Sequence, residues 1–163
     1  MTIAIYPGRF DPVTAGHLDI VQRAAKLFEK IVVSVFDAPE KATMFSTQER
    51  IGLFQEALRG VKGVEVKPFS GLVVDYARNQ GATAIVRGIR MNADFEYEFE
   101  MALMNRRLAP DIDVVCLMTD IQYQFVRASL IKEVARLGGD ITGLAPPNVI
   151  AALNARFGQS PLP

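Results

Sequence analysis

The sequence predicts a single α/β domain built on a doubly wound, five-stranded parallel sheet with helices on both faces and a helical tail. Five short apolar runs alternate with stretches of helical periodicity, an order typical of strand–helix–strand units with right-handed crossovers. The chain has 163 residues, half of them hydrophobic, which suffices for one full core, and no composition shift marks a linker. We therefore expect residues 1–163 to form one domain with a Rossmann-like fold.

The expected elements follow one another in pairs along the chain. The first strand, at 3–6, precedes a helix at 15–28, whose apolar residues recur at Leu18, Val21, Ala25 and Phe28. Further strands are expected at 31–36, 64–67, 84–86 and 114–118, and further helices at 48–58, 72–79, 93–108 and 130–137.

Local signals mark several helix ends. Ser46 and Glu49 have the spacing of a capping box and place a helix start directly after Ser46. The glycines at 138–139 end the helix at 130–137, and the prolines at 146–147 open a final helix. We expect residues 158–163 to be a frayed tail.

Composition limits the classes of function. Eighteen basic residues balance 18 acidic ones, so no overall field draws the protein to nucleic acid or to an anionic membrane. The single cysteine, Cys116, lies in an apolar run that predicts a buried, inert thiol and argues against a disulfide framework or a zinc site. The first residues lack the pattern of a secretion signal, and no apolar run approaches the ~18 residues of a membrane span, so we expect a cytoplasmic protein.

The junction between the first strand and the first helix carries the strongest functional signal. Thr14, Gly16 and His17 lie where the helix begins, and a helix N-terminus offers free amides and a positive dipole end to phosphate. His17 is the only histidine, and in this place we expect it to stabilise phosphate charge. The alternative is a histidine that only caps its own helix or fills a polar gap.

Cations follow four of the five predicted strands. Arg9 and His17 follow the first, Lys41 the second, Arg87 and Arg90 the fourth, and Arg127 the fifth. Because the carboxyl ends of parallel strands meet at one edge of a sheet, these residues predict a site for two or more phosphate groups, with Gly88 giving backbone access. Alternatively, Lys41 is a solvated loop charge, and Arg87 pairs with Asp94 or Glu96.

The chain lacks the usual motifs of covalent and metal-dependent catalysis. It has no Gly-x-Ser-x-Gly elbow, no Walker motif and no pair of metal-binding histidines. No covalent catalyst is required if the attacking group is itself an anionic phosphate, because catalysis then consists of positioning and charge stabilisation. Nucleotidyl transfer fits these parts.

At these residues the sequence resembles the nucleotidyltransferase superfamily with the T/H-x-G-H signature, and within it the bacterial phosphopantetheine adenylyltransferases. The resemblance covers nearly the whole chain. It rests on the Thr14–His17 signature and on a set of further motifs, of which the most specific are Arg87-Gly88-Ile89-Arg90, Asp94-Phe95-Glu96-Tyr97-Glu98, Met104-Asn105-Arg106 and Leu130-Ile131-Lys132-Glu133-Val134-Ala135.

The resemblance implies reversible transfer of AMP from ATP to the 4′-phosphate of phosphopantetheine, giving dephospho-CoA and pyrophosphate without a covalent intermediate. Mg²⁺ would arrive with ATP, and dephospho-CoA or CoA would bind as product or inhibitor. His17 would be the catalytic residue, and the phosphopantetheine contacts would be Arg9, Lys41, Val73 and Arg87. ATP would contact Arg9, Phe10, His17, Gly88, Ile89, Arg90, Glu98, Tyr123, Gln124, Phe125, Val126, Arg127, Ala128 and Ser129. The family assembles as a homohexamer.

Two positions depart from the family pattern. Arg9 replaces a common Thr or Ser, and Arg127-Ala128-Ser129 replaces a run of hydroxyl residues, so each change adds a charge where a small hydroxyl is usual. Two alternative functions stay open: a related adenylyltransferase that acts on nicotinamide or flavin mononucleotide, and a nucleotide-binding regulator without catalysis. The spacing of Met101, Met104 and Leu108 indicates helix core or a subunit interface.

Overall fold

The computed structural model describes residues 2–37 and 43–159 and confirms the predicted fold class. Five parallel strands form one sheet in the order β3-β2-β1-β4-β5. The strands are β1 (Ile3–Gly8), β2 (Lys30–Phe36), β3 (Val64–Phe69), β4 (Ala84–Ile89) and β5 (Asp113–Met118). The order reverses between β1 and β4, and this reversal is where ligands bind in doubly wound sheets.

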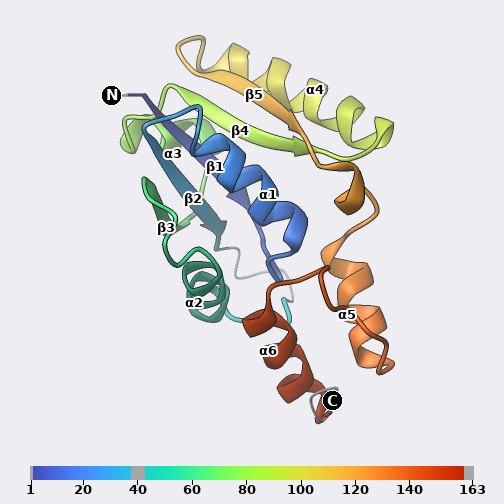
Figure 1. The fold of residues 1–163 in the computed structure, drawn as a ribbon. Coiled ribbons are helices and arrows are strands. Elements are labelled where there is room, and N and C mark those ends of the chain that lie inside the picture. The colour runs from blue at the N-terminus through green and yellow to red at the C-terminus, as the bar shows by residue number, and fades with distance from the viewer. Residues whose placement is uncertain (1, 38–42, 160–163) are drawn as a thin grey trace.

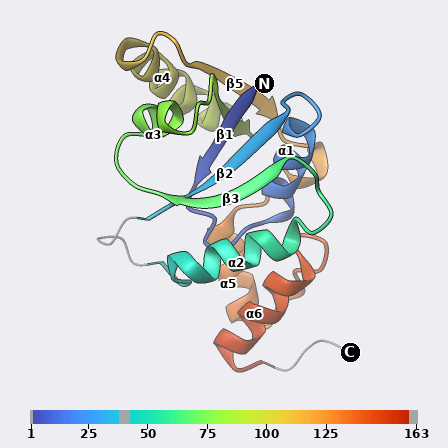
Figure 2. The same ribbon diagram turned by 90° about the vertical axis from the view of Figure 1, so that its left-hand side faces the viewer.

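Helices cover both faces of the sheet. They are α1 (Ala15–Ala24), α2 (Thr47–Ala57), α3 (Val73–Asn79), α4 (Asn92–Leu108), α5 (Ala128–Arg136) and α6 (Pro147–Phe157), and a short 3₁₀ helix, η1 (Ile121–Tyr123), precedes α5. Figure 2 shows α1 on one side of the strands and α3 and α4 on the other. In Figure 1, α5 and α6 lie beyond the carboxyl end of β1. No helix in the described part of the chain is long and apolar enough to cross a membrane.

Two hydrophobic clusters reflect the alternation of side chains along the strands. Ala4 and Tyr6 of β1 face the larger cluster, which includes Ile20 and Val21 of α1, while Ile5 between them faces the smaller cluster under α3. The larger cluster also contains residues of α2, α5 and α6. The side chains of one strand therefore fix the helices on both faces.

Several predicted boundaries shift. β1 extends to Gly8 and β4 to Ile89. Arg87 and Gly88 therefore lie within β4, near its end, rather than after it. The first helix ends at Ala24, and the chain up to Phe28 forms tighter turns, with bonds such as that from the Leu27 N–H to the Ala24 carbonyl.

The predicted helix caps are present. Ser46 and Glu49 form the capping box of α2, and Pro147 opens α6. Gly158 ends α6 in the left-handed conformation, and the Gln159 side chain donates to the Arg136 carbonyl, so residues 158–159 belong to the helix end rather than to a tail. Residues 160–163 lie outside the described residues.

The prediction of a buried Cys116 is wrong. β5 is an edge strand with β4 as its neighbour, and Cys116 is exposed. An uninterrupted apolar run is typical of a central parallel strand, but the strand order placed this run at the edge. Partial desolvation of the thiol still raises the pKa of Cys116, and the Glu98 charge adds to the effect.

Candidate active site

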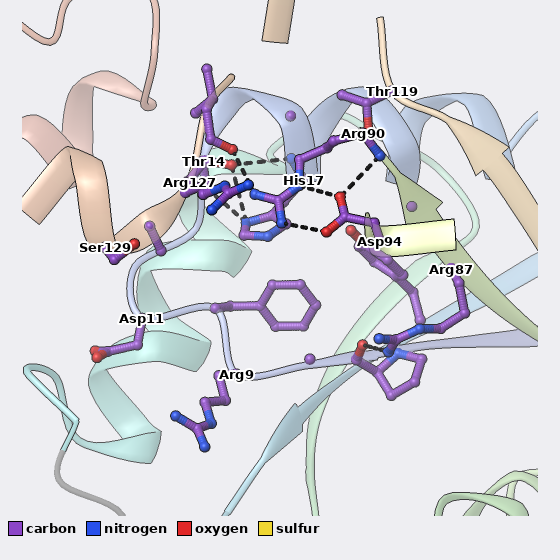
Figure 3. Close-up of a pocket in the computed structure, with 18 of the residues that line it drawn as sticks. Arg9, Asp11, Thr14, His17, Arg87, Arg90, Asp94, Thr119, Arg127 and Ser129 are labelled. Atoms are coloured by element: carbon purple, nitrogen blue, oxygen red, sulfur yellow. Dashed lines mark hydrogen bonds and ion pairs between the residues drawn. The ribbon is translucent and has the colours of Figure 1, made fainter. Parts of the chain in front are cut away.

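A cavity of about 460 Å³ opens at the carboxyl ends of β1 and β4, where the strand order reverses. Its wall comes from the β1–α1 loop, the start of α1, the end of β4, α4 and the start of α5 (Figure 3). The residues that line it include Arg9, Phe10, Asp11, Thr14, Gly16, His17, Arg87, Gly88, Arg90, Asp94, Glu98, Thr119, Val126, Arg127, Ala128, Ser129 and Lys132.

His17 is oriented by the helix that it begins. Thr14 is the N-cap of α1, and its backbone N–H donates to Nδ1 of His17 at 3.0 Å. The His17 N–H in turn donates to Oγ1 of Thr14, which completes a reciprocal capping box. Because Nδ1 accepts this bond, the neutral ring carries its proton on Nε2. The capping role and the phosphate-binding role are therefore compatible, since each uses a different ring nitrogen.

The imidazole is neutral. Burial lowers the pKa of His17 from 6.5 to about 3, and the positive charges of Arg90 and Arg87 lower it further. The position of His17 in the sequence suggested that it is one of the cations of the site. The structure shows instead that it is neutral. It is a neutral hydrogen-bond donor at a helix N-terminus, and such a donor can stabilise negative charge on a phosphate oxygen.

Phe10 supports the imidazole from one side. Its ring lies edge-on to the His17 ring, with centroids 5.0 Å apart, and the residue is only 4% exposed. Phe10 has φ of 51°, a left-handed conformation that costs a non-glycine residue about 1 kcal/mol. A Cβ at Gly8 would lie 2.7 Å from Cζ of Phe10, so only glycine leaves room for this ring.

Arg87 is held by Glu98, which is neither of the partners considered from the sequence. Nε and Nη2 of Arg87 donate to the two carboxylate oxygens of Glu98 at 2.7 and 2.5 Å, and Nη1 donates to the Pro7 carbonyl at 2.9 Å. Burial lowers the pKa of Arg87, but the Glu98 hydrogen bond and charge outweigh it and raise the pKa overall. A guanidinium has five N–H donors, so two remain for a ligand.

Arg90 is fixed in a similar way. Its Nε and Nη2 donate to Asp94 at 3.0 and 3.2 Å, and its Nη1 donates to the Val126 carbonyl at 3.0 Å. The last bond ties the end of β4 to the segment that enters α5. The pKa of Asp94 stays below its ordinary value, because the bonds and charge of Arg90 outweigh the effect of burial.

Asp11 connects three segments behind the phosphate-binding wall. Its carboxylate accepts the backbone N–H groups of Met44 and Phe45, both at 2.9 Å, and Nζ of Lys132 at 3.0 Å. Asp11 is 6% exposed, and although burial raises its pKa, these three bonds lower it overall. The sequence alone does not reveal the contact between Asp11 and Lys132, because they are 121 positions apart and no local pattern relates them.

The buried Arg50 clamps the same region from α2. It is 2% exposed and donates to the carbonyls of Arg9 at 2.7 Å, Phe36 at 3.0 Å and Phe45 at 3.2 Å. These acceptors are the chain just beyond β1, the end of β2 and the chain before α2. Arg50 therefore fixes the backbone at Arg9, whose side chain is exposed.

Arg9 and Arg127 are the cavity cations without a carboxylate partner among the described residues. The Arg9 side chain is exposed, and Arg127 contacts only the sulfur of Met91, at 3.7 Å. Arg127 is also the N-cap residue of α5, so the amides of Ala128 and Ser129 open toward the cavity without intrahelical partners. The two positions that depart from the family pattern are thus the two cavity cations that have no carboxylate partner in the part of the chain that the structure describes.

A second cavity of about 490 Å³ adjoins the first and is mainly apolar. It is lined by residues of α3 and α4 and by strand ends, among them Phe36, Phe69, Leu72, Val73, Met101, Met104 and Leu108. Both cavities are lined by Pro7, Gly8, Arg9, Arg87 and Glu98, so they meet at the end of β1. Met101, Met104 and Leu108 of α4 therefore form part of the cavity wall rather than a helix core.

Other predicted residues lie near the site without lining the first cavity. Ile89 and residues 123–125 do not line it, and Tyr123 packs behind Gly16. Gly88 lines the cavity, but it also lets β4 approach α1, because a Cβ there would lie 3.1 Å from Cγ1 of Ile20. Lys41 lies outside the described residues.

Comparison with known proteins identifies the family of the chain. The family model of cytidylyltransferase-like proteins matches residues 5–134. The phosphopantetheine adenylyltransferase of Thermomicrobium roseum is 56% identical over 157 residues, which cover 94% of each chain. That of Geotalea daltonii is 49% identical over 159 residues, which cover 98% of this chain and 99% of the relative. The chain belongs to the phosphopantetheine adenylyltransferase family.

Solved structures agree on the fold of this family member. A bifunctional NMN adenylyltransferase/ADP-ribose pyrophosphatase from Francisella tularensis superposes with a TM-score of 0.71 at 17% identity, over 96% of this chain and 51% of that chain. Identity at this level shows the fold alone. The membership in the phosphopantetheine adenylyltransferase family, and with it the assignment as a nucleotidyltransferase, comes from the closer relatives.

Proposed function

We propose that this enzyme transfers AMP from ATP to the 4′-phosphate of phosphopantetheine and releases pyrophosphate and dephospho-CoA. The observation that carries the proposal is the junction of two cavities at Arg9 and Arg87, one lined by cations and helix N-termini and the other mainly apolar. The first suits a triphosphate, and the second suits the pantetheine arm, with Val73 and the α4 methionines along it. The names of relatives that are 49–56% identical support the same substrates.

The reaction then proceeds by in-line displacement. An oxygen of the acceptor phosphate attacks the α-phosphorus, and the bond between that phosphorus and the oxygen bridging to the β-phosphate breaks. The attacking oxygen is already anionic, so no proton has to be removed and no covalent enzyme intermediate forms. The electron pair leaves on pyrophosphate.

Each side chain has a role in this scheme that follows from its contacts. Nε2–H of His17 donates to the α-phosphate as negative charge builds up on it. The two free N–H groups of Arg87, together with Lys41, hold the acceptor phosphate. The amides that begin α5 bind the β- and γ-phosphates, with the Arg127 side chain beside them.

Mg²⁺ enters the scheme as part of the nucleotide complex, where it neutralises phosphate charge. The described residues contain no cluster of three His, Cys, Asp or Glu side chains able to hold a metal ion. The cavity carboxylates of Asp11, Asp94 and Glu98 are each bonded to a cation of the protein. These residues fit an ion that is held by phosphate oxygens and water.

The test is pyrophosphate release from ATP with a panel of acceptors. Phosphopantetheine should support turnover, while pantetheine, which lacks the phosphate, should not. Nicotinamide mononucleotide and FMN represent the alternative adenylyltransferases. Turnover with either in preference to phosphopantetheine would contradict the proposal. If none of the acceptors in the panel supports pyrophosphate release, the result would favour a regulator without catalysis.

We further propose a cytoplasmic homohexamer in which dephospho-CoA and CoA compete for the apolar cavity. A row of exposed apolar side chains on α4 outside the two cavities supports subunit association, namely Phe95, Phe99 and Leu103. Sedimentation analysis should give the mass of six copies, and a monomer would contradict the assembly. Inhibition by CoA should be competitive with phosphopantetheine.

A further inference from the structure

The cavity wall contains a hydroxyl group that the contacts described above do not use. Thr119 follows β5, is 5% exposed and lines the first cavity. No side-chain hydrogen bond joins its Oγ1 to another described residue, and Oγ1 is not among the fully buried atoms without a partner, so the hydroxyl opens to the cavity. A hydroxyl that opens to a cavity without a protein partner is satisfied by water, and a ligand hydroxyl can replace that water.

The backbone around Thr119 is held rigidly. Its own N–H donates to the Ile89 carbonyl at 2.8 Å. On either side, the Met118 carbonyl accepts from Arg23, and the Asp120 N–H donates to Asp19. Arg23 and Asp19 form an ion pair along α1, so one helix fixes both neighbours of Thr119. A hydroxyl placed in this way can bind a ligand with little loss of conformational entropy.

Two glycines leave space beside the hydroxyl. A Cβ at Gly16 would lie 3.5 Å from Cγ2 of Thr119, and a Cβ at Gly88 would lie 3.8 Å from its Oγ1. Both glycines line the same cavity. Thr119 therefore forms the floor of a recess, defined by Gly16, Gly88 and Thr119, in which atoms of a ligand can approach the backbone closely.

The position of the recess relative to His17 indicates which part of a nucleotide enters it. In Figure 3, Arg127 and Ser129 lie on one side of His17 and Thr119 lies on the other. If His17 contacts the α-phosphate and the start of α5 binds the β- and γ-phosphates, the opposite side receives the ribose, which is joined to the α-phosphate through one oxygen. The 2′- and 3′-hydroxyls are the hydroxyl groups of the ribose, and each can both donate and accept a hydrogen bond on that side.

We propose that Thr119 is a ribose-binding residue, whose Oγ1 hydrogen-bonds to the 2′- or 3′-hydroxyl of ATP. This assignment rests on the proposed use of ATP at this site, and it adds a nucleotide contact that the sequence motifs do not include. It predicts that the enzyme distinguishes ATP from one of its deoxy analogues through a single protein hydroxyl.

The test is equilibrium binding of ATP, 2′-deoxy-ATP and 3′-deoxy-ATP, measured by calorimetry, to the wild-type enzyme and to Thr119→Val and Thr119→Ser. The wild-type enzyme should bind one deoxy analogue about 3- to 10-fold more weakly than ATP, the range expected for one neutral hydrogen bond. Thr119→Val should bind ATP more weakly by a similar factor and should no longer distinguish that analogue. Thr119→Ser keeps the hydroxyl and should keep the discrimination.

Thr83→Val is the matched control, because Thr83 is exposed and immediately precedes the start of β4 at the opposite end of the sheet. Its ATP affinity should equal that of the wild-type enzyme. Unchanged ATP affinity in Thr119→Val would overturn the proposal. The proposal would also be overturned if Thr119→Val bound ATP more weakly but still distinguished ATP from the deoxy analogue as the wild-type enzyme does. The hydroxyl would then contact the base or a phosphate.

The binding measurement needs no acceptor, so it separates this inference from the proposed reaction. If the acceptor panel identifies another substrate, the result for Thr119 stands. If the wild-type enzyme binds ATP and Thr119→Val binds it equally well, only the Thr119 assignment fails. If the wild-type enzyme binds no ATP, both proposals are wrong.

Discussion

Substitutions of His17 can separate its structural role from its catalytic role, because each role uses a different ring nitrogen. Nδ1 accepts the Thr14 N–H at 3.0 Å and completes the capping box of α1. Nε2 carries the proton and is the atom available to a phosphate oxygen. Alanine removes both functions. Glutamate keeps an acceptor for the cap but has no donor, whereas glutamine offers both.

The structure sets the size of each effect. Thr14 remains as N-cap residue in every variant, so His17→Ala loses only half of the capping box, and we expect the free energy of unfolding to fall by about 0.5–1 kcal/mol. Loss of a donor aimed at charge that develops in the transition state costs about 10²- to 10³-fold in kcat, or ~2.7–4 kcal/mol. The catalytic effect is therefore several times larger than the structural one.

We expect His17→Glu to unfold at the wild-type denaturant midpoint but to have a kcat as low as that of His17→Ala. His17→Gln should also keep the stability, and its kcat should exceed that of His17→Glu by at least about 10-fold, since its amide can still donate. The KM for ATP should change little in His17→Ala and His17→Gln, because the donor acts mainly in the transition state, whereas the carboxylate of His17→Glu should raise it by repelling phosphate.

The assays are pyrophosphate release under saturating substrates and chemical denaturation of each variant. Equal kcat for His17→Glu and His17→Gln would refute the role of the Nε2 donor. A kcat near the wild-type value in His17→Ala would leave His17 with its capping role alone. A large loss of stability in His17→Glu would show that the capping contact is wrongly assigned.

Three further predictions concern the charges around the site. Arg127→Ser, which restores the usual family residue, should raise the KM for ATP and lower its salt sensitivity, because one unpaired cation is lost; unchanged values for both would make Arg127 a surface residue. Arg87→Ala should lower kcat/KM for phosphopantetheine by a factor that corresponds to about 2–4 kcal/mol. It should weaken phosphopantetheine binding more than ATP binding, since Arg87 lies where the two cavities meet. Equal losses for the two substrates would contradict its assignment to the acceptor. Stability should fall with acidification already between pH 7 and 5, because the unfolded chain binds a proton at His17 below its ordinary pKa of 6.5, while the folded chain binds one only near its lowered pKa of about 3. His17 is the only histidine, so the melting temperature of His17→Gln should be flat over this range, and a slope equal to that of the wild-type enzyme would refute the lowered pKa.

The sequence by itself determined the elements and the start of the site. Apolar periodicity and capping residues are local signals, and they located every strand and helix of the sheet to within a few residues. The Thr14–His17 signature predicted a phosphate site at the first helix N-terminus, and the structure places Thr14 there as N-cap with His17 three residues later. These features follow from neighbouring residues, so they could be predicted without tertiary contacts.

Only the tertiary structure decided which groups meet. An apolar run does not reveal whether its strand is central or at an edge, and the strand order exposed Cys116 on β5. The choice of Glu98 as partner of Arg87 depends on how α4 lies against β4, because Asp94 and Glu96 are nearer to Arg87 in the sequence than Glu98 is. The contact between Asp11 and Lys132 joins segments 121 positions apart, so it forms only when the β1–α1 loop and α5 pack together at one end of the sheet.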